Sequence, residues 1–210
     1  MSDQLPGHER PQNFKRSAFH AGWGLFAVWL ASSYLSPLEL TLVSGSFTVI
    51  AWGLELLKRT SARGARLFEL LFNSITHKHE ADQINSATWY CSAVFVSTLL
   101  FEPVAIIGSV LCLAVGDPIA GIVGRSIGRV KLIGRRTLEG TLAFTFSATL
   151  ATWALLSLQY PSVTHPVLIA LAGGGSAALA ELLSGHWLDD NVSVPLTAAT
   201  GISLSMSVLG

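Results

Sequence analysis

The sequence predicts an all-α, polytopic transmembrane bundle, and three observations lead to that prediction. The chain of 210 residues is 50% hydrophobic but only 12% charged, against about 25% charged in an ordinary soluble domain. A soluble protein of this size needs more charged residues to cover its surface, since charges are rarely buried without partners. Apolar stretches of near-spanning length recur along the chain, and the basic residues fall between alternate pairs of them.

The first element is a polar tail, and a series of apolar stretches follows it. Residues 1–13 hold two prolines and show no apolar period, so we expect them to lie outside a single transmembrane domain of residues 14–210. Most of the stretches are close to the ~20 residues that cross a hydrocarbon core. The seven predicted spans are 19–36, 38–57, 86–101, 103–123, 138–158, 166–183 and 192–209. A signal sequence over 19–36 is the alternative for the first, but Tyr34-Leu35-Ser36-Pro37 is a poor cleavage site.

The distribution of basic residues predicts the orientation. Arg and Lys in short loops are retained on the cytoplasmic side during insertion. With a cytoplasmic N-terminus, all 13 Lys and Arg fall before the first span, after the second or after the fourth. The opposite loops hold Glu39, Glu102 and His165, and the odd number of spans places Gly210 outside. Polar groups that could do chemistry are then confined to about 58–85, 116–137 and 184–191, on the cytoplasmic face.

Two basic segments border the first two spans. Lys15, Arg16 and His20 precede or open the first span, where they could contact phosphate or anchor the chain to the membrane surface. In the loop after the second span, the apolar residues of 66–72 recur at helical spacing beside charged ones, which indicates an interfacial helix or a plain connector. His77 and His79 lack zinc-binding spacing, whereas Glu80 beside them is a candidate catalytic carboxylate.

The fourth predicted span contains Gly116-Asp117-Pro118. A carboxylate inside a membrane span is costly enough to indicate a functional site. Pro118 lacks an amide hydrogen and disfavours helical geometry at the preceding residue, so we expect the helix to break here and to free backbone groups. Three glycines follow, Gly121, Gly124 and Gly128, whose amides could donate to phosphate or whose size could let helices pack closely. The segment is no Walker loop, because the Gly-Lys-Ser/Thr ending is absent.

The fifth predicted span begins with a basic dipeptide. Arg135 and Arg136, with Lys131 upstream, stand at a helix N-terminus that favours anions, so they are candidate phosphate ligands. Glu139 is a candidate metal ligand or catalytic base. The alternative is structural: Thr137 would cap the helix, Glu139 would favour its dipole, and the arginines would contact lipid headgroups.

The last predicted span begins with Asp189-Asp190-Asn191. These three side chains offer hard oxygen ligands of the kind that Mg²⁺ accepts beside substrate phosphates. Capping the helix needs only one of them, and adjacent carboxylates repel each other unless a cation or an arginine lies near. The two cysteines, Cys91 and Cys112, lie in apolar runs without metal-type spacing and are interpreted as small core residues.

Taken in order, these motifs resemble those of one membrane family. They are Lys15-Arg16 with His20, His79-Glu80, Gly116-Asp117-Pro118-Ile119-Ala120, Thr137-Leu138-Glu139-Gly140 and Asp189-Asp190-Asn191-Val192-Ser193-Val194-Pro195. The chain resembles, from about residue 14 to 200, the CTP-dependent lipid kinases: dolichol kinase, phytol kinase and the yeast-type diacylglycerol kinase. It departs from them at Arg136-Thr137, where the family usually has Lys-Ser.

The resemblance implies transfer of the γ-phosphoryl group of CTP, or of another nucleoside triphosphate, to the hydroxyl of a lipid alcohol. We therefore expect Mg²⁺ as cofactor, CTP as co-substrate and no nucleic-acid partner. Asp117, Asp189 and Asp190, supported by Asn191, would hold Mg²⁺, while Asp117, Glu139, Asp190 and Glu80 are the candidate catalytic residues. The candidate phosphate-binding residues are Gly116, Gly121, Gly124, Gly128, Lys131, Arg135, Arg136, Thr137, Lys15, Arg16 and His20.

Three alternatives stay open, and one of them is a non-catalytic membrane scaffold. A cytidylyltransferase that makes a CDP-lipid needs the same cation and phosphate contacts, and it would release pyrophosphate instead of CDP. A small transporter could use the broken fourth span and Asp117 as its binding site, although the charged groups gather at one membrane face. The compact chain without a targeting extension favours a bacterial inner membrane, with the active site on the cytoplasmic face.

Overall fold

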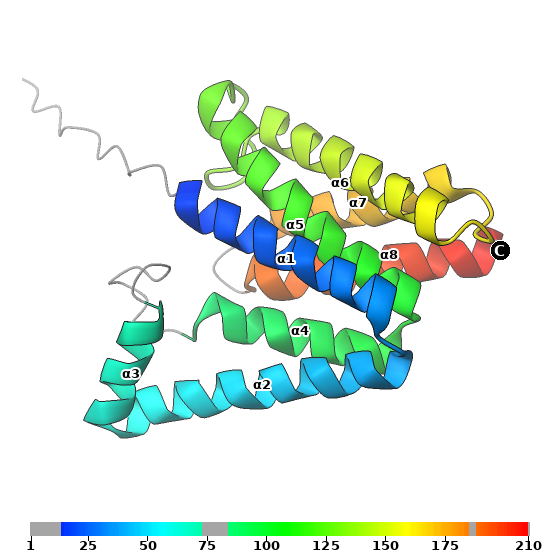
Figure 1. The fold of residues 1–210 in the computed structure, drawn as a ribbon. Helices are drawn as coiled ribbons and strands as arrows, with labels where there is room; N and C mark the ends of the chain where they lie inside the picture. Colours follow the sequence, from blue (N-terminus) through cyan, green and yellow to red (C-terminus); the bar gives the residue numbers. More distant parts are fainter. Residues whose placement is uncertain (1–13, 73–83, 185–187, 210) are drawn as a thin grey trace, which may run out of the picture.

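The computed structural model describes residues 14–72, 84–184 and 188–209, and within these ranges the chain is all-α (Figure 1). The regular structure is α-helical apart from an isolated bridge between Lys131 and Thr137. Its eight helices are α1 Phe14–Tyr34, α2 Pro37–Thr60, α3 Ala62–Phe72, α4 Ser86–Leu100, α5 Pro103–Ser126, α6 Leu138–Gln159, α7 Pro166–Leu183 and α8 Asp190–Leu209.

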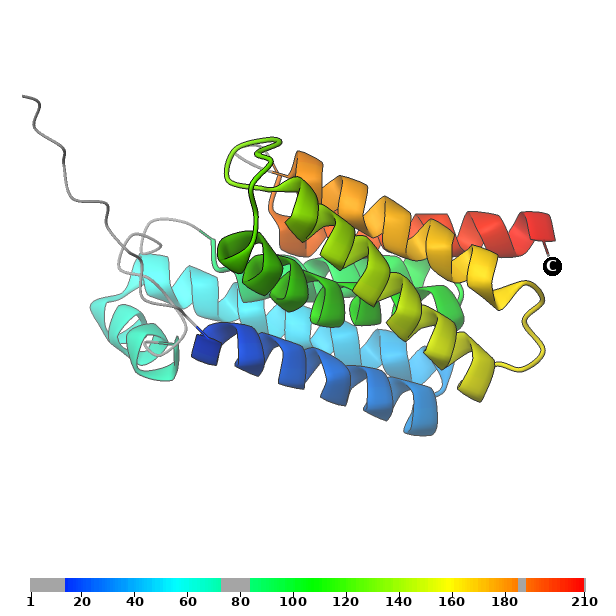
Figure 2. The same ribbon diagram turned by 90° about the horizontal axis from the view of Figure 1, so that it is seen from above.

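The helix α5 lies at the centre of the bundle. It packs against α6, α7 and α8 on one side and against α1 and α4 on others, while α2 packs mainly on α4 (Figures 1 and 2). The residues from Ala105 to Ala114 are all buried, which explains why this helix is apolar without an amphipathic stripe. All the long helices run roughly along one direction, so their ends gather at two opposite ends of the molecule.

Five of the described helices, α2, α5, α6, α7 and α8, are long and apolar enough to cross a membrane. Their outward faces carry large apolar side chains, such as Leu38, Val49, Leu158 and Val208, that are mostly exposed. This surface suits contact with lipid, and the prediction of an integral membrane protein agrees with it.

The other two predicted spans correspond to α1 and α4. The helix α1 has 21 residues but lies outside that set of five, and α4 is apolar but only 15 residues long. The count of seven spans, and the orientation with a cytoplasmic N-terminus, therefore stay predictions.

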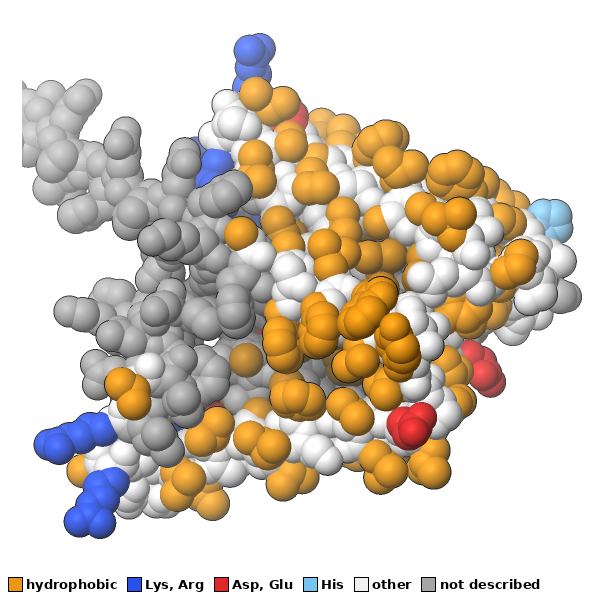
Figure 3. All heavy atoms as spheres, viewed as in Figure 1, with side chains coloured by type: hydrophobic (Ala, Val, Ile, Leu, Met, Phe, Trp, Pro, Cys, Tyr) orange, Lys and Arg blue, Asp and Glu red, His pale blue; other side chains and the backbone are white. Residues whose placement is uncertain are grey.

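The described basic side chains gather toward one end of the bundle. Figure 3 shows Lys and Arg at the end that holds α3 and the α5–α6 connection, many apolar side chains along the visible face, and acidic side chains and a histidine toward the opposite end. We call this end the basic end. It carries the C-terminal ends of α2, α5 and α7 and the N-terminal ends of α4, α6 and α8.

The expected break at Pro118 is wrong, because α5 continues as one helix from Pro103 to Ser126. Proline removes one helical hydrogen bond, yet membrane helices tolerate it where neighbouring helices hold the backbone. Here the ring of Phe144 lies directly against Gly116, only 2.7–2.8 Å from where a Cβ atom would stand. Packing against α6 thus outweighs the local preference of proline to end the helix.

The helix predicted over residues 66–72 is present as part of α3. Gly64 lets the chain turn tightly from α2 into α3, since a Cβ atom at this position would collide with the carbonyl of Leu57. Phe68 is buried, and the ammonium group of Lys58 lies 4.6 Å from its ring centroid. The segment therefore packs back on the end of α2 as a helix.

Candidate active site

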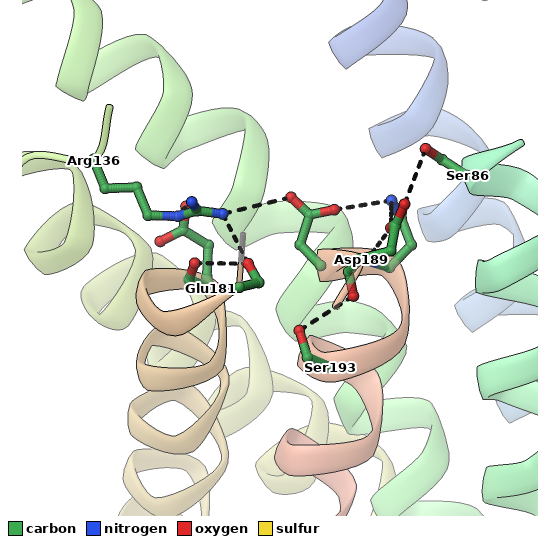
Figure 4. A network of polar contacts seen from close by, with 8 residues as sticks. Ser86, Arg136, Glu181, Asp189 and Ser193 are labelled. Carbon is green, nitrogen blue, oxygen red and sulfur yellow. Dashed lines mark hydrogen bonds and ion pairs between the residues drawn. The ribbon is translucent and has the colours of Figure 1, made fainter. Parts of the chain in front are cut away.

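A cluster of charged and polar side chains lies at the basic end, between α5, α6, α7, α8 and α4 (Figure 4). We call it the polar cluster and define it by Ser86, Asp117, Arg136, Glu181, Ser184, Asp189, Asp190 and Asn191. Its members come from α4, α5, α7 and α8 or their caps and from the connection that precedes α6, which are far apart in the sequence. Of the residues predicted for the site, it brings together Asp117, Arg136, Asp189, Asp190 and Asn191.

Arg136 is the basic member of the polar cluster. Its Nε donates a hydrogen bond to Glu181 Oε1 at 2.7 Å, and its Nη2 donates to Ser184 Oγ at 2.8 Å. The same Nη2 lies 3.8 Å from Asp190 Oδ2. Its side chain is 24% exposed and that of Glu181 is 12% exposed, so both groups lie largely out of water. The guanidinium therefore joins the end of α7 to the start of α8.

The local structure before α6 explains why Arg136 points inward. The chain folds back on itself, with Leu132 N donating to Arg136 O at 2.9 Å and Leu138 N donating to Val130 O at 2.8 Å. Gly134 makes the turn in the left-handed region, at φ 61°, which favours glycine. Thr137 then caps α6, its side-chain oxygen accepting from Gly140 N at 3.2 Å.

The acidic turn before α8 is held by its own hydrogen bonds. Asp189 Oδ1 accepts from the backbone N of Asn191 at 2.9 Å and from its Nδ2 at 2.8 Å. The same Nδ2 donates to Asp190 Oδ1 at 3.0 Å. Ser86 donates to Asp189 Oδ2 at 3.5 Å, so the first turn of α4 also borders the acidic pair. One amide thus bridges two carboxylates and fixes their directions.

The polar cluster holds more acidic side chains than basic ones. Asp117 interacts electrostatically with both Asp190 and Glu181, and Asp190 with Asp189 as well. The cluster therefore contains four carboxylates and one arginine. Carboxylates this close together favour a bound cation, because each one otherwise raises the cost of ionising its neighbours.

The carboxylate of Glu139 binds backbone amides of the loop between α5 and α6 and is not part of the polar cluster. Its Oε1 accepts from Arg129 N at 2.9 Å, and both oxygens lie 3.3 Å from Val130 N. These contacts hold the loop between α5 and α6 against the first turn of α6. The structural alternative, in which Glu139 acts as a helix-terminal carboxylate, describes this geometry, and any part of Glu139 in metal binding or proton transfer stays a hypothesis.

The glycines of α5 sit mainly at helix contacts. A Cβ atom on Gly124 would lie 3.0 Å from Thr137 Oγ1, and one on Gly128 would lie 2.7 Å from the same oxygen. Since α5 is continuous, the amides of Gly121 and Gly124 lie inside a helix, and the expectation that a break frees them for phosphate is wrong. Close packing of α5 on α6 accounts for Gly116 and Gly124, while Gly128 lies just beyond α5, where a Cβ atom would also collide with the carbonyl of Gly124.

The remaining predicted residues lie outside the polar cluster or outside the described side chains. Lys131 and Arg135 are exposed on the connection before α6. Lys15, Arg16 and His20 lie in the first turns of α1, which begins at the basic end, but their side chains are not described. Glu80 lies in 73–83, outside the described residues.

Sequence reasoning missed Glu181 and Ser86. Glu181 is the single charged residue in the predicted span 166–183, and the rule applied to Asp117 covers it equally. Ser86 has no comparable signal, since a serine at the start of an apolar stretch is ordinary. Its contact with Asp189 depends on how α4 and α8 pack together, which the sequence does not show (Figure 4).

A second polar group, formed by Glu55, Lys58 and Asn85, was also missed. Glu55 is 1% exposed within α2, and Lys58 Nζ lies 2.8 Å from its Oε2. Its Oε1 accepts from the backbone N of Asn85 at 2.7 Å, and Asn85 caps α4 through a hydrogen bond to Ala87 N at 2.8 Å. The hydrogen bonds of Asn85 with Glu55 and Ala87 therefore fix the start of α4, where Ser86 lies.

Among the described residues, no group of three or more His, Cys, Asp or Glu side chains is arranged to hold a metal ion by itself. Mg²⁺ commonly takes only one or two protein carboxylates and completes its shell with water and substrate phosphates. The excess of carboxylates beside Arg136 fits that kind of shared site, with Asp117 and Asp190 as the candidate ligands.

The comparisons with known proteins give a consistent result. The chain is 24% identical over 209 residues to the CTP-dependent diacylglycerol kinase 1 of Schizosaccharomyces pombe, covering 95% of this chain and 94% of that protein. It is 20% identical over 218 aligned positions to the enzyme of the same name from Saccharomyces cerevisiae, covering 95% of this chain and 74% of that protein. The similarity supports a CTP-dependent lipid kinase family.

A third relative, an uncharacterized protein of Methanocaldococcus jannaschii, is 30% identical over 135 residues, 62% of this chain and 64% of that protein. No protein-family model matches the chain, and no solved structure does. The polar cluster lies at the basic end of the bundle, whose outward faces carry exposed apolar side chains.

Proposed function

We propose that the protein is a membrane-embedded lipid kinase that transfers the γ-phosphoryl group of CTP to the hydroxyl of a lipid alcohol. Diacylglycerol is the first acceptor to test because the two yeast relatives are diacylglycerol kinases, and polyprenols and phytol-like alcohols are the further candidates. The observation that carries the proposal is the polar cluster, in which Arg136 lies within 3.8 Å of Asp190 and contacts Glu181.

Phosphoryl transfer needs positioning and charge neutralisation more than covalent chemistry. In the proposed mechanism the hydroxyl oxygen of the lipid bonds to the γ-phosphorus, and the bond from that phosphorus to the β–γ bridging oxygen breaks. CDP leaves, and the proton of the hydroxyl passes to Asp189, whose Oδ2 faces Ser86. Arg136 binds phosphate oxygens through donors not used by Glu181.

Asp117 and Asp190 are the proposed holders of Mg²⁺, which would neutralise triphosphate charge when bound. Asn191 keeps the two carboxylates of the acidic turn in fixed directions through its amide. Glu181 orients the guanidinium of Arg136. Lys131 and Arg135, exposed on the same connection, would meet the nucleotide from the water side, with the basic end taken as cytoplasmic.

Of the alternatives, the transporter depended on a broken fourth span, and α5 is continuous. The cytidylyltransferase is distinguished by its products. Purified protein in detergent would be given CTP labelled at the α- or the γ-phosphate, Mg²⁺ and a panel of diacylglycerol, polyprenol, phytol and phosphatidic acid. The kinase moves γ-label to an alcohol and releases CDP. Release of pyrophosphate with α-label in the lipid would contradict it, as would no transfer by folded protein.

A further inference from the structure

We propose that an apolar cavity between α1, α2, α4 and α5 binds the hydrocarbon chain of the lipid alcohol and so delivers its hydroxyl to the polar cluster. The proposal rests on the proposed function and deepens it, because it names where the acceptor is held. The cavity has a volume of about 150 Å³ and is partly open to the outside. It lies beside the core, apart from the charged groups described above.

The chemistry of the cavity wall specifies an apolar occupant. The wall consists of Trp, Phe, Leu, Ile, Val and Ala side chains, with Ser44, Tyr90 and Cys91 as the polar types. The hydroxyl of Ser44 is turned to its own helix, where it donates to Thr41 O at 3.1 Å. Apolar cavities of about this size stay dry and accept small apolar groups, so a segment of hydrocarbon chain fits and a nucleotide does not.

Helix packing explains why the space is present. The helix α1 packs on α5 and α2 packs on α4, so the first two helices have different partners (Figure 1). Gly24 of α1 approaches α5 so closely that a Cβ atom there would lie 2.6 Å from Ala114 Cβ. Gly45 of α2 approaches α4 similarly, with 3.0 Å to the ring of Phe95. The cavity lies between these two tightly packed pairs.

One face of α4 joins the cavity to the polar cluster. Tyr90 and Val94 line the cavity, and Ser86 precedes Tyr90 by four residues. Residues four apart lie on the same face of a helix, about 6 Å apart along its axis. Ser86 donates to Asp189 Oδ2. A chain that lies against Val94 and Tyr90 therefore leads, within one helical turn, to the carboxylate proposed to receive the hydroxyl proton.

The occupant is the substrate chain and not a soluble apolar molecule, because two of the lining helices, α2 and α5, are long and apolar enough to cross a membrane, and α2 exposes Leu38 and Val49 on its outward face. A chain leaving the bilayer gains little hydrophobic free energy, since lipid tails are as apolar as the cavity wall. The cavity therefore selects its occupant by shape, because a chain that fills it makes dispersion contacts with the wall that an empty space would lack. It positions the acceptor and selects its chain length.

The test uses a matched pair of substitutions on α4. Val94 lines the cavity, while Val96, two residues further, is 39% exposed and is not part of the wall. We expect Val94→Trp to lower kcat/KM for dioleoylglycerol about tenfold, because a misplaced acceptor loses its orientation, and to change kcat/KM for dioctanoylglycerol much less. Val96→Trp should leave both values and the thermal midpoint close to those of the unmodified protein. Equal effects of the two variants, or equal losses for long and short chains, would overturn the proposal.

A second measurement separates this inference from the kinase assignment. Unmodified protein in liposomes would be photolabelled, without nucleotide, by a diacylglycerol carrying a diazirine in its chain. We expect labelled peptides from the cavity wall and competition by unlabelled diacylglycerol but not by phosphatidylcholine. Equal competition by phosphatidylcholine would identify a bulk lipid chain as occupant and overturn the proposal. If the wall is labelled but no phosphoryl group is transferred to any acceptor, the result would contradict the proposed kinase activity and still support lipid binding in the cavity.

Discussion

Arg136, on the connection before α6, and Glu181, on α7, are 45 positions apart in the sequence and form a hydrogen bond of 2.7 Å between Nε and Oε1. The same guanidinium donates to Ser184 and lies 3.8 Å from Asp190. Arginine presents its donors in a rigid planar fork, which lysine cannot reproduce. At this position the CTP-dependent lipid kinases usually have a lysine. In this chain, the contacts with Glu181, Ser184 and Asp190 hold the arginine in place.

Replacing Arg136 by Lys should lower kcat for CTP-dependent transfer by about 10²-fold, in line with the loss of one positioned charge donor. The single ammonium group of a lysine can contact either Glu181 or the phosphates, whereas the guanidinium of arginine can donate to both at once. Steady-state kinetics with CTP and diacylglycerol would measure the effect. The control is Arg63→Gln on α3, which removes an exposed guanidinium from the same end of the molecule. If Arg136→Lys kept full kcat, the guanidinium would not act on the phosphates.

Replacing Glu181 by Gln should destabilise the folded protein. The carboxylate is 12% exposed and pairs with a guanidinium that is 24% exposed. Removing the carboxylate leaves the Nε donor of Arg136 without its charged acceptor, so we expect a loss of about 1–3 kcal/mol. The thermal midpoint in detergent would report it, compared with Glu102→Gln at the exposed start of α5. An unchanged midpoint would show that Arg136 finds another partner.

Replacing Asp190 by Asn should separate stability from activity. Asp190 lies near Asp117 and Asp189, and removing one of several close carboxylates relieves their repulsion. We expect an unchanged or higher thermal midpoint together with a fall in kcat of about 10³-fold. A variant that loses stability and activity in parallel would argue for a structural role of Asp190 alone.

Replacing Gly116 by Ala should destabilise the contact between α5 and α6. The new Cβ atom would stand 2.7 Å from the ring of Phe144, which is fully buried. Overpacking of this kind costs about 1–3 kcal/mol. The matched control is Gly53→Ala on α2, where no atom lies within 4 Å and where alanine should raise stability by about 0.5–1 kcal/mol. Denaturation midpoints of both variants would check the opposite signs.

Much of the architecture could be predicted from the sequence, because the apolar stretches and the sparse charges each follow from simple rules. Helices α2 and α5 to α8 lie within a few residues of the predicted spans. The convergence of Asp117, Arg136 and Asp190 agrees with their expected place at one end. The break predicted at Pro118 was wrong, since the local preference of proline takes no account of the packing of α5 on α6, where the Phe144 ring lies against Gly116.

The finer geometry depends on contacts between distant segments. Glu139 turns to the loop amides of Arg129 and Val130 because the chain folds back at Gly134, which the sequence does not reveal. Glu181 was overlooked although its signal was present, as a lone charge in an apolar span. The buried Glu55 gives the same signal in α2.

The most direct test of the proposed mechanism compares two acidic residues on α5. Asp117 lies in the polar cluster, and Glu102 is exposed at the opposite end of the same helix. The measurement is transfer of γ-labelled phosphate from CTP to diacylglycerol in liposomes with Mg²⁺. The proposed mechanism predicts that Asp117→Asn lowers transfer by about 10³-fold while Glu102→Gln transfers as the unmodified protein does. Full transfer by Asp117→Asn, or equal losses in both folded variants, would contradict it.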